Sequence, residues 1–280
     1  MAERIIVSLT TWSKRIGNIP VVLDTIFNQT KQPDLVVLNL AYNEVVPKDV
    51  QHYIDTHKIE INRVPDTKVY KKLIPTLKKY PDDCVISIDD DWLYPKEMIA
   101  DFINIHKQHP DFPISGNTVV LFGMQCHCGC ASLQKACYFG DFIDSIDNGV
   151  IQNCPSDDIV YTYFSNKAGH PYLRTSSLFY ENMTPFNNEI SYTQSEVRNN
   201  GIETSFDYLI QRFGDLDNLY LPYIKDQYFS DLVNDIHKKD VKREIRKASN
   251  KVKNEMLQTK SYRLGNLFVR PLSRLINIFK

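Results

Sequence analysis

The sequence predicts an α/β fold with a mostly parallel central sheet flanked by helices, followed by a basic helical extension. Short apolar runs typical of buried strands alternate with segments of helical spacing along the first hundred residues or so. One of these runs, Val85–Ile88, stops abruptly in three consecutive carboxylates, Asp89, Asp90 and Asp91. The basic residues also gather at the C-terminal end of the chain. These observations together favour a Rossmann-like domain whose functional groups lie at strand ends.

The expected elements follow one another in alternation. In chain order we expect a strand at Arg4–Leu9, a helix at Ile19–Asn28, a strand at Leu35–Leu40, a helix at Lys48–Thr56, a strand at Ile59–Arg63, a helix at Leu73–Lys79, a strand at Cys84–Ile88 and a helix at Pro95–His106. Strands separated by helices form parallel βαβ units, which bind ligands beyond the carboxyl ends of the strands. The Thr10–Arg15 loop and the three aspartates each follow a strand, so we expect both at that edge.

The second half of the chain is less regular. A further strand is expected at Pro113–Phe122, and the cysteine-rich stretch from there to Pro155 has no clear periodicity. Helices are expected at Ser156–Asn166 and Asn199–Phe213. Asp157 and Asp158 fall in the first turn of the former, where the helix dipole favours carboxylates.

Composition places the chain among ordinary globular proteins. It has 280 residues, 42% apolar and 24% charged. The apolar run near the N-terminus is too short for a secretory signal, and no window approaches about 18 uninterrupted apolar residues. We therefore expect a cytoplasmic protein whose six cysteines are reduced thiols.

Charge is distributed unevenly along the chain. Lys238–Lys280 contains 13 basic and 3 acidic residues, a net of +10, whereas the remainder has a net of −11. We expect a catalytic domain over residues 1–235 and a basic extension over 236–280. Gly265–Lys280 interleaves Arg and Lys with Leu, Ile and Phe, which suggests peripheral binding to the anionic inner face of the cell membrane. The alternative is a helix that packs on the domain or pairs two subunits as a homodimer. No stacking pattern accompanies the charge, so nucleic acid is not expected.

The three aspartates suit a hard divalent cation. Alternation along an extended chain would place Asp89 and Asp91 on one side and Asp90 on the other. Two nearby carboxylates repel unless a cation lies between them, and oxygen-only ligands favour Mg²⁺ or Mn²⁺. The alternative is that the aspartates cap the helix that follows.

Four motifs taken together resemble a glycosyltransferase of the GT-A type, and more narrowly the family-2-like enzymes that build bacterial surface polysaccharides. These motifs are Ile6-Val7-Ser8-Leu9-Thr10-Thr11 with Arg15, Tyr70-Lys71-Lys72-Leu73-Ile74-Pro75, Ile88-Asp89-Asp90-Asp91 with Tyr94-Pro95, and Ser156-Asp157-Asp158-Ile159. The resemblance runs from about Ile5 to Asn166. The aspartate motif with the preceding Lys-Lys-Leu-Ile-Pro segment is its most specific part.

The resemblance implies roles for the residues at the donor site. In such enzymes the aspartate motif binds a divalent metal, Mn²⁺ or Mg²⁺, that bridges the diphosphate of a nucleotide-sugar. Asp91 matches the direct metal ligand, and Asp89 matches a residue that touches the ribose or a metal-bound water. The residues expected to contact the nucleotide-sugar are Thr10, Arg15, Lys72, Asp89 and Asp90. A surface salt bridge for Arg15 and a solvated helix face for Lys72 remain the alternatives.

The acceptor side needs a base. An inverting transfer requires a carboxylate that takes the proton of the attacking hydroxyl. Asp158 aligns with the second residue of the family's downstream acidic pair and is the expected base, with Asp157 as the second choice. The alternative is that both are merely first-turn helix carboxylates.

The function that the resemblance implies is metal-dependent transfer of a sugar, a hexosyl group in such enzymes, from a UDP-sugar to a growing polysaccharide or lipid-linked glycan. A sugar nucleotidyltransferase is the first alternative, but it should carry a glycine-rich loop after the first strand, and Thr10–Gly17 holds a single glycine. A non-catalytic glycan- or membrane-binding module is the second. The chain departs from the family pattern at Cys126-His127-Cys128-Gly129-Cys130 with Cys137, which could bind zinc but is better explained as small buried or semi-exposed thiols lining the acceptor side.

Overall fold

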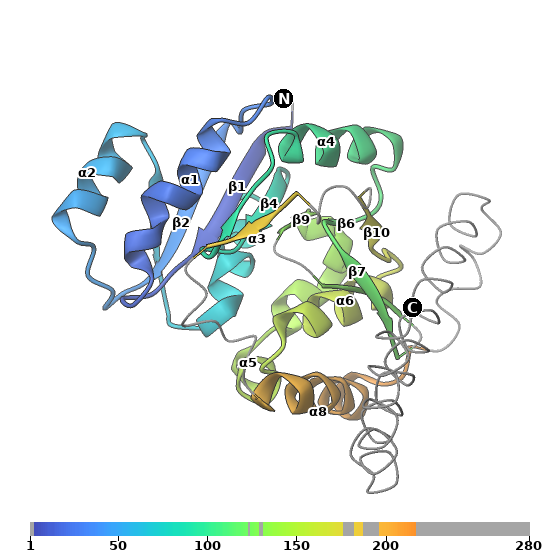
Figure 1. Cartoon of the computed structure of the whole chain (residues 1–280). Coiled ribbons are helices and arrows are strands. Elements are labelled where there is room, and N and C mark those ends of the chain that lie inside the picture. Colours follow the sequence, from blue (N-terminus) through green and yellow to red (C-terminus); the bar gives the residue numbers. More distant parts are fainter. Residues whose placement is uncertain (1–2, 123, 129–130, 176–181, 187–195, 217–280) are drawn as a thin grey trace, which may run out of the picture. The chain divides into compact units, whose positions relative to one another are not determined.

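The computed structural model describes residues 3–122, 124–128, 131–175, 182–186 and 196–216 (Figure 1). The described helices, including the short 3-10 helices named η, are η1 (Ile16–Asn18), α1 (Ile19–Phe27), α2 (Lys48–Thr56), η2 (Lys68–Lys72), α3 (Ile74–Lys79), α4 (Met98–Gln108), η3 (Ala136–Ser145), α5 (Asn148–Asn153), α6 (Asp157–Lys167) and α8 (Glu196–Phe213). The described strands are β1 (Ile5–Thr10), β2 (Leu35–Ala41), β3 (Glu60–Val64), β4 (Cys84–Ile88), β5 (Trp92–Leu93), β6 (Ile114–Ser115), β7 (Thr118–Leu121), β8 (Met124–His127), β9 (Ala131–Gln134), β10 (Leu173–Arg174) and β11 (Thr184–Pro185).

Seven strands form the central sheet, in the order β10-β6-β9-β4-β1-β2-β3. Every neighbouring pair is parallel except the two that involve β9, which runs against β4 and β6. The predicted α/β class with a mostly parallel central sheet is confirmed. Because β1 and β4 are parallel neighbours in the sheet, with Ser8 opposite Ser87, the loops that follow them emerge side by side.

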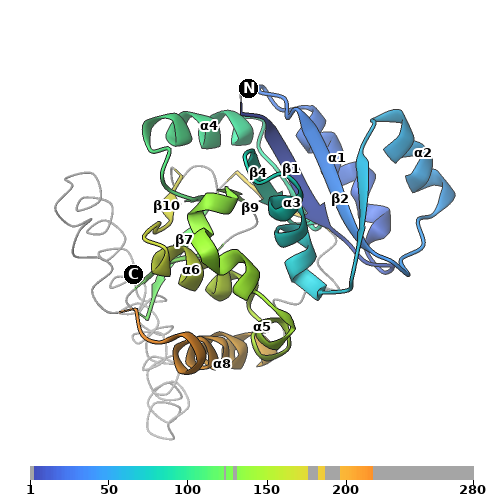
Figure 2. The same ribbon diagram turned by 180° about the vertical axis from the view of Figure 1, so that it is seen from behind.

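Helices cover both faces of the sheet, with α1 on one face and α3 on the other (Figures 1 and 2). Such cover explains why β1 and β4 are mostly apolar and why every residue of the two strands except Thr10 is buried, including Ser8 and Ser87. Pro20 and Pro75 lie in the first turns of α1 and α3, where proline removes a donor that has no partner in the helix.

Two predicted elements differ from the structure, and a stretch without a prediction contains elements of its own. The strand expected at Pro113–Phe122 is two strands in different sheets, because Ser115 pairs within the central sheet and the chain then turns into the β7–β8 hairpin. The helix expected from Pro95 begins at Met98. The stretch left unassigned contains β8, β9, η3 and α5, short elements that lack the length for a clear period.

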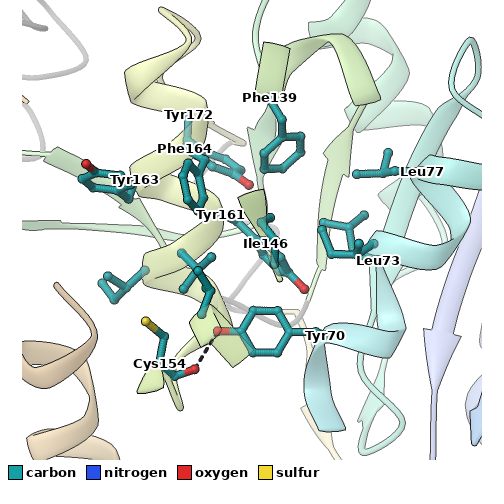
Figure 3. Packing of buried hydrophobic residues seen from close by; sticks show 14 of the residues in the cluster. Tyr70, Leu73, Leu77, Phe139, Ile146, Cys154, Tyr161, Tyr163, Phe164 and Tyr172 are labelled. Atoms are coloured by element: carbon teal, nitrogen blue, oxygen red, sulfur yellow. Dashed lines mark hydrogen bonds between the residues drawn. The ribbon is translucent and has the colours of Figure 1, made fainter. Parts of the chain in front are cut away.

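A large apolar cluster packs η2, α3 and α6 together beneath the sheet (Figure 3). The ring of Tyr70 meets that of Tyr161 edge to face at 5.9 Å, and its hydroxyl donates to the carbonyl oxygen of Cys154 at 2.6 Å. Tyr161 in turn meets Phe139 edge to face at 6.2 Å. These buried rings hold η2 and α6 at a fixed position relative to each other. The polar residues of the two helices are therefore fixed as well.

All described elements belong to the first of the two units into which the chain divides, Met1–Pro222. The boundary expected at residue 235 and the basic extension 236–280 lie outside the described residues and stay predictions. Among the described helices, none is long and apolar enough to cross a membrane.

Candidate active site

Two loops meet beyond the carboxyl ends of β1 and β4. Thr11 Oγ1 donates to Asp90 Oδ2 at 2.6 Å. Arg15 lies between two carboxylates, with Nη2 3.0 Å from Asp90 Oδ1 and Nη1 2.5 Å from Asp91 Oδ2. Asn18 Nδ2 adds a hydrogen bond to the carbonyl oxygen of Asp90 at 3.2 Å. The loop after β1 is therefore fastened to the aspartate motif, as its position in the parallel sheet predicted.

The aspartates are not arranged as the alternation predicted. Asp90 and Asp91 share Arg15, whereas Asp89 pairs with Lys72 and also interacts with the charge of Asp91. The reason is that β4 ends at Ile88, so the motif lies in a turn where the strand period no longer applies. The helix-cap alternative is wrong as well, because α4 begins seven residues after Asp91 and its N-cap is Glu97.

Lys72 joins the aspartate motif to the acidic pair on α6. Its Nζ lies 3.1 Å from Asp89 Oδ1 and 3.0 Å from Asp157 Oδ2. Ser8 in the middle of β1 donates to the backbone carbonyl of Lys72 at 2.6 Å and so anchors the end of η2 to the sheet. Lys72 is buried, so the alternative of a solvated helix face is wrong. Its neighbour Lys71 pairs instead with Asp66.

Burial and charge act in opposite directions on these groups. Burial lowers the pKa of Lys72, but Asp157, Asp89 and Asp158 outweigh it and hold the pKa well above its ordinary value. Burial raises the pKa of Asp89, and Lys72 opposes this effect. Burial likewise raises the pKa of Asp90 to about 6, against the stabilising contacts of Arg15 and Thr11. Lys72 therefore stays charged, and the motif carboxylates are held in a costly, partly desolvated state.

Asp157 and Asp158 lie in the first turn of α6, where the sequence placed them. Both also have partners outside the helix. Asp157 pairs with Lys72, and its side chain is 11% exposed. Asp158 Oδ1 lies 3.4 Å from His127 Nε2, and its side chain is 22% exposed. A role limited to the helix dipole therefore does not account for either residue, and Asp158 is the more accessible of the two.

The contact of Thr10 with the nucleotide stays a prediction, and the structure gives the partners of Thr10 and its neighbour within the chain. The hydroxyl of Thr10 donates to the backbone carbonyl of Asn39, so Thr11 rather than Thr10 contacts the aspartate motif through its side chain. Sequence reasoning missed Thr11 and Ser8, although a serine inside an apolar strand was a signal for a buried polar contact. It also placed His127 with the cysteines and not with Asp158.

Cys126 and His127 do not share a metal site. Consecutive residues of β8 face opposite ways: Cys126 is buried in the apolar cluster, and His127 faces Asp158. Cys126 is thus a buried thiol that interacts electrostatically with Asp158. Cys137 is exposed, and Gly129 and Cys130 lie outside the described residues.

Within the described residues, one trio of side chains has the spacing of a metal site, namely Glu3, Cys84 and His106, at the opposite end of β4. The Glu3 carboxylate there already pairs with Lys135 and with His106. These contacts account for the cluster without an ion.

Comparison with known proteins finds similar structures but no similar sequences. No family model matches the chain, and no curated protein matches it. A crystal structure of 4-diphosphocytidyl-2C-methyl-D-erythritol synthase aligns with 64% of this chain and 92% of its own, at 9% identity and a TM-score of 0.44. The S. aureus TarS 1–349 structure aligns with 62% of this chain and 58% of its own, at 13% identity and a TM-score of 0.43.

Glucosyl-3-phosphoglycerate synthase from Mycobacterium tuberculosis, in complex with Mn²⁺, UDP-glucose and phosphoglyceric acid, aligns with 41% of this chain and 43% of its own. The identity is 14% and the TM-score 0.33. The alignments thus span about half the length of the last two proteins. All three TM-scores are below 0.5, so the function proposed below depends on the residues of the site itself.

Proposed function

We propose that this chain is a metal-dependent glycosyltransferase of the GT-A type, which moves a sugar from a nucleoside-diphosphate donor, a UDP-sugar, to a growing polysaccharide or lipid-linked glycan. The observation that carries the proposal is the position of Lys72. Its ammonium group contacts both Asp89 of the aspartate motif and Asp157 of the acidic pair. The aspartate motif and the acidic pair, two of the four motifs that carry the family resemblance, are 68 residues apart at Asp89 and Asp157 and form one ion-pair network, as a single active site requires.

The charges of this network fit a divalent cation. Five carboxylates of the described residues meet two cations, Arg15 and Lys72, which leaves an excess of three negative charges when all five are ionised. Asp91 and Asp89 would hold Mn²⁺ or Mg²⁺. When bound, the metal would supply Lewis-acid stabilisation of the leaving diphosphate. Arg15 already contacts one oxygen of Asp91, so it must share or release that oxygen when a metal binds.

The residues on the acceptor side have roles in the proposed reaction. Asp158 takes the proton of the acceptor hydroxyl while the hydroxyl oxygen bonds to the anomeric carbon of the sugar. The bond from that carbon to the diphosphate oxygen breaks, and the nucleoside diphosphate leaves with the electron pair. Attack opposite the leaving group inverts the anomeric centre. Lys72 pairs with Asp157 and holds it in place beside this base.

Calorimetric titration with UDP in the presence of Mn²⁺ tests the proposal. The wild type should release heat, and Asp91→Asn should weaken Mn²⁺-dependent UDP binding by at least about tenfold, since a metal ligand is lost. Asp82→Asn is the matched control, because Asp82 is an exposed aspartate near the other end of β4. An unchanged affinity in Asp91→Asn contradicts the metal assignment. No heat in the wild type favours the non-catalytic module instead.

Metal-dependent hydrolysis of a panel of nucleotide-sugars would identify the donor. The first donors to test are UDP-glucose, present in the M. tuberculosis structure described above, and UDP-GlcNAc, present in a further structure of S. aureus TarS 1–349. The family assignment to bacterial surface polysaccharide synthesis, the lipid-linked acceptor and the membrane contact of residues 236–280 are parts of the same proposal. Each depends on the sequence alone.

A further inference from the structure

A second polar cluster lies at the end of β4 opposite the aspartate motif. It joins Glu3, which precedes β1, to Cys84, the first residue of β4, and to His106 near the end of α4. A carboxylate oxygen, the sulfur and a ring nitrogen of these side chains all lie within 4.8 Å of one another. Cys84 and His106 are buried, whereas Glu3 is exposed. At about 3.3 Å per residue, Cys84 is about 16 Å from Asp89 along the strand, so the two clusters cannot share an ion.

The neighbours of His106 decide which of its ring nitrogens carries a proton. The hydroxyl of Tyr138 donates its single proton to the carbonyl oxygen of Pro110 at 2.6 Å. Its contact with Nδ1 of His106, at 3.2 Å, therefore requires an Nδ1–H that donates to the tyrosine oxygen. The other ring nitrogen, Nε2, lies 3.1 Å from Glu3 Oε2. A neutral imidazole has one N–H, so Nε2 of a neutral His106 turns a lone pair toward the carboxylate.

This arrangement requires a cation between Nε2 and the carboxylate. In the ion-free chain a second ring proton fills that place, and the contacts of Glu3 with His106 and Lys135 then satisfy the cluster. Zinc suits the same place, because it binds imidazole nitrogen, thiolate sulfur and carboxylate oxygen. Nitrogen and oxygen ligands about 2.0 Å from a tetrahedral zinc ion are about 3.3 Å apart, close to the 3.1 Å between Nε2 and Glu3 Oε2.

The groups around the trio hold its members as metal ligands are held in proteins. A metal-binding histidine donates its other N–H to a neighbouring oxygen, as His106 Nδ1 does toward Tyr138. A metal-binding carboxylate accepts a further hydrogen bond, as Glu3 Oε1 does from Lys135. Burial would raise the pKa of the Glu3 carboxyl group, but hydrogen bonds, above all from Lys135 and Cys84, outweigh it and lower the pKa. The carboxylate is therefore ionised and ready to bind a cation.

We propose that Glu3, Cys84 and His106 form a zinc-binding site, which ties the segment before β1 to β4 and α4. Zn²⁺ takes the place of the Nε2 proton, and a water molecule on the exposed side of Glu3 completes four ligands. Burial, with Glu3 beside it, raises the pKa of the Cys84 thiol, so the thiol gives up its proton to solvent as the sulfur binds the ion. The site is separate from the proposed Mn²⁺ or Mg²⁺ site, whose protein ligands are oxygens.

Titration of the reduced full chain with Zn²⁺, in competition with a chromogenic chelator, tests the site. Cys84→Ala should weaken zinc binding by at least about 100-fold, because a ligand is lost. Tyr138→Phe, which removes the oxygen that orients His106, should weaken it by roughly 10- to 100-fold. Cys137→Ser is the matched control, because Cys137 is an exposed cysteine. A wild type that binds no zinc, or an unchanged affinity in Cys84→Ala, overturns the inference.

Co²⁺ in place of Zn²⁺ reports the sulfur ligand directly, because a thiolate bound to Co²⁺ absorbs in the near ultraviolet. The wild type and Asp91→Asn should both show this band, since Asp91 belongs to the other metal site. Cys84→Ala should not show it. A band that persists in Cys84→Ala and disappears in Cys128→Ser places the ion at the other cysteines, and the inference is then wrong.

A stability measurement keeps the test valid if the buried Cys84→Ala variant does not fold. An ion that binds the folded chain raises the midpoint of urea denaturation. Zn²⁺ should raise it in the wild type and in Asp91→Asn, but not in Glu3→Gln, which changes an exposed side chain. An equal rise in the wild type and Glu3→Gln overturns the inference. Mn²⁺-dependent UDP binding should be the same in these two proteins, so the zinc site and the proposed function are tested separately.

Discussion

The pH dependence of folding stability should reveal the buried, neutral state of His127. Burial, reinforced by Lys72, lowers the pKa of this histidine to about 3 in the folded chain. In the unfolded chain the ring takes a proton near its ordinary pKa of about 6.5. Below that pH the unfolded state binds more protons than the folded state, so stability is full above about pH 7 and is lost as the pH falls toward 3.

The size of the effect follows from the two pKa values. Each tenfold difference in acidity corresponds to about 1.4 kcal/mol, so the complete loss is on the order of 5 kcal/mol. Between pH 8 and pH 5 the loss from this residue alone is about 2 kcal/mol. That is a large fraction of the stability of a typical domain.

Urea denaturation of wild type and His127→Gln at pH 8, 7, 6 and 5 measures this loss. Glutamine keeps an N–H donor but does not titrate, so other ionisable groups cancel in the difference between the two proteins. The wild type should lose about 2 kcal/mol more than the variant between pH 8 and pH 5, at constant m-value. If both proteins lose stability in parallel, His127 takes up a proton in the folded chain as readily as in the unfolded chain, and its buried, neutral state is refuted.

Three further predictions concern the ion-pair network and the extension. Lys72→Met should lower the free energy of unfolding by about 3 to 5 kcal/mol at pH 7, because Asp89 and Asp157 lose their shared cation. The loss should be smaller at pH 4, and urea denaturation at the two pH values measures it. Arg15→Ala should strengthen binding of Mn²⁺ alone by calorimetry, since a competitor for the aspartates is removed; weaker binding would contradict the competition. Deleting Gly265–Lys280, with three basic residues, should weaken sedimentation with anionic vesicles by roughly 100-fold at about 1 kcal/mol each, and unchanged partitioning would reject the membrane contact.

The regular part of the fold was predictable because its signals are local. The helix Lys48–Thr56 was predicted with its observed bounds, and the strand Cys84–Ile88 likewise. Each depends on hydrophobic spacing and on residues that begin or end an element, which neighbouring positions in the sequence encode. The elements between Pro113 and Pro155 could not be predicted, because the strands there are two to four residues long and too short to show a hydrophobic period.

The sequence by itself determined that carboxylates follow the strand ending at Ile88 and open the helix at Asp157, since both positions depend on local patterns. Only the tertiary structure decided which side chains meet there. Lys72 reaches Asp157, and His127 reaches Asp158, across separations that no spacing rule covers. The reason is that such pairs form where the apolar core fixes η2, β8 and α6 against one another, and burial then sets the charge that each group carries.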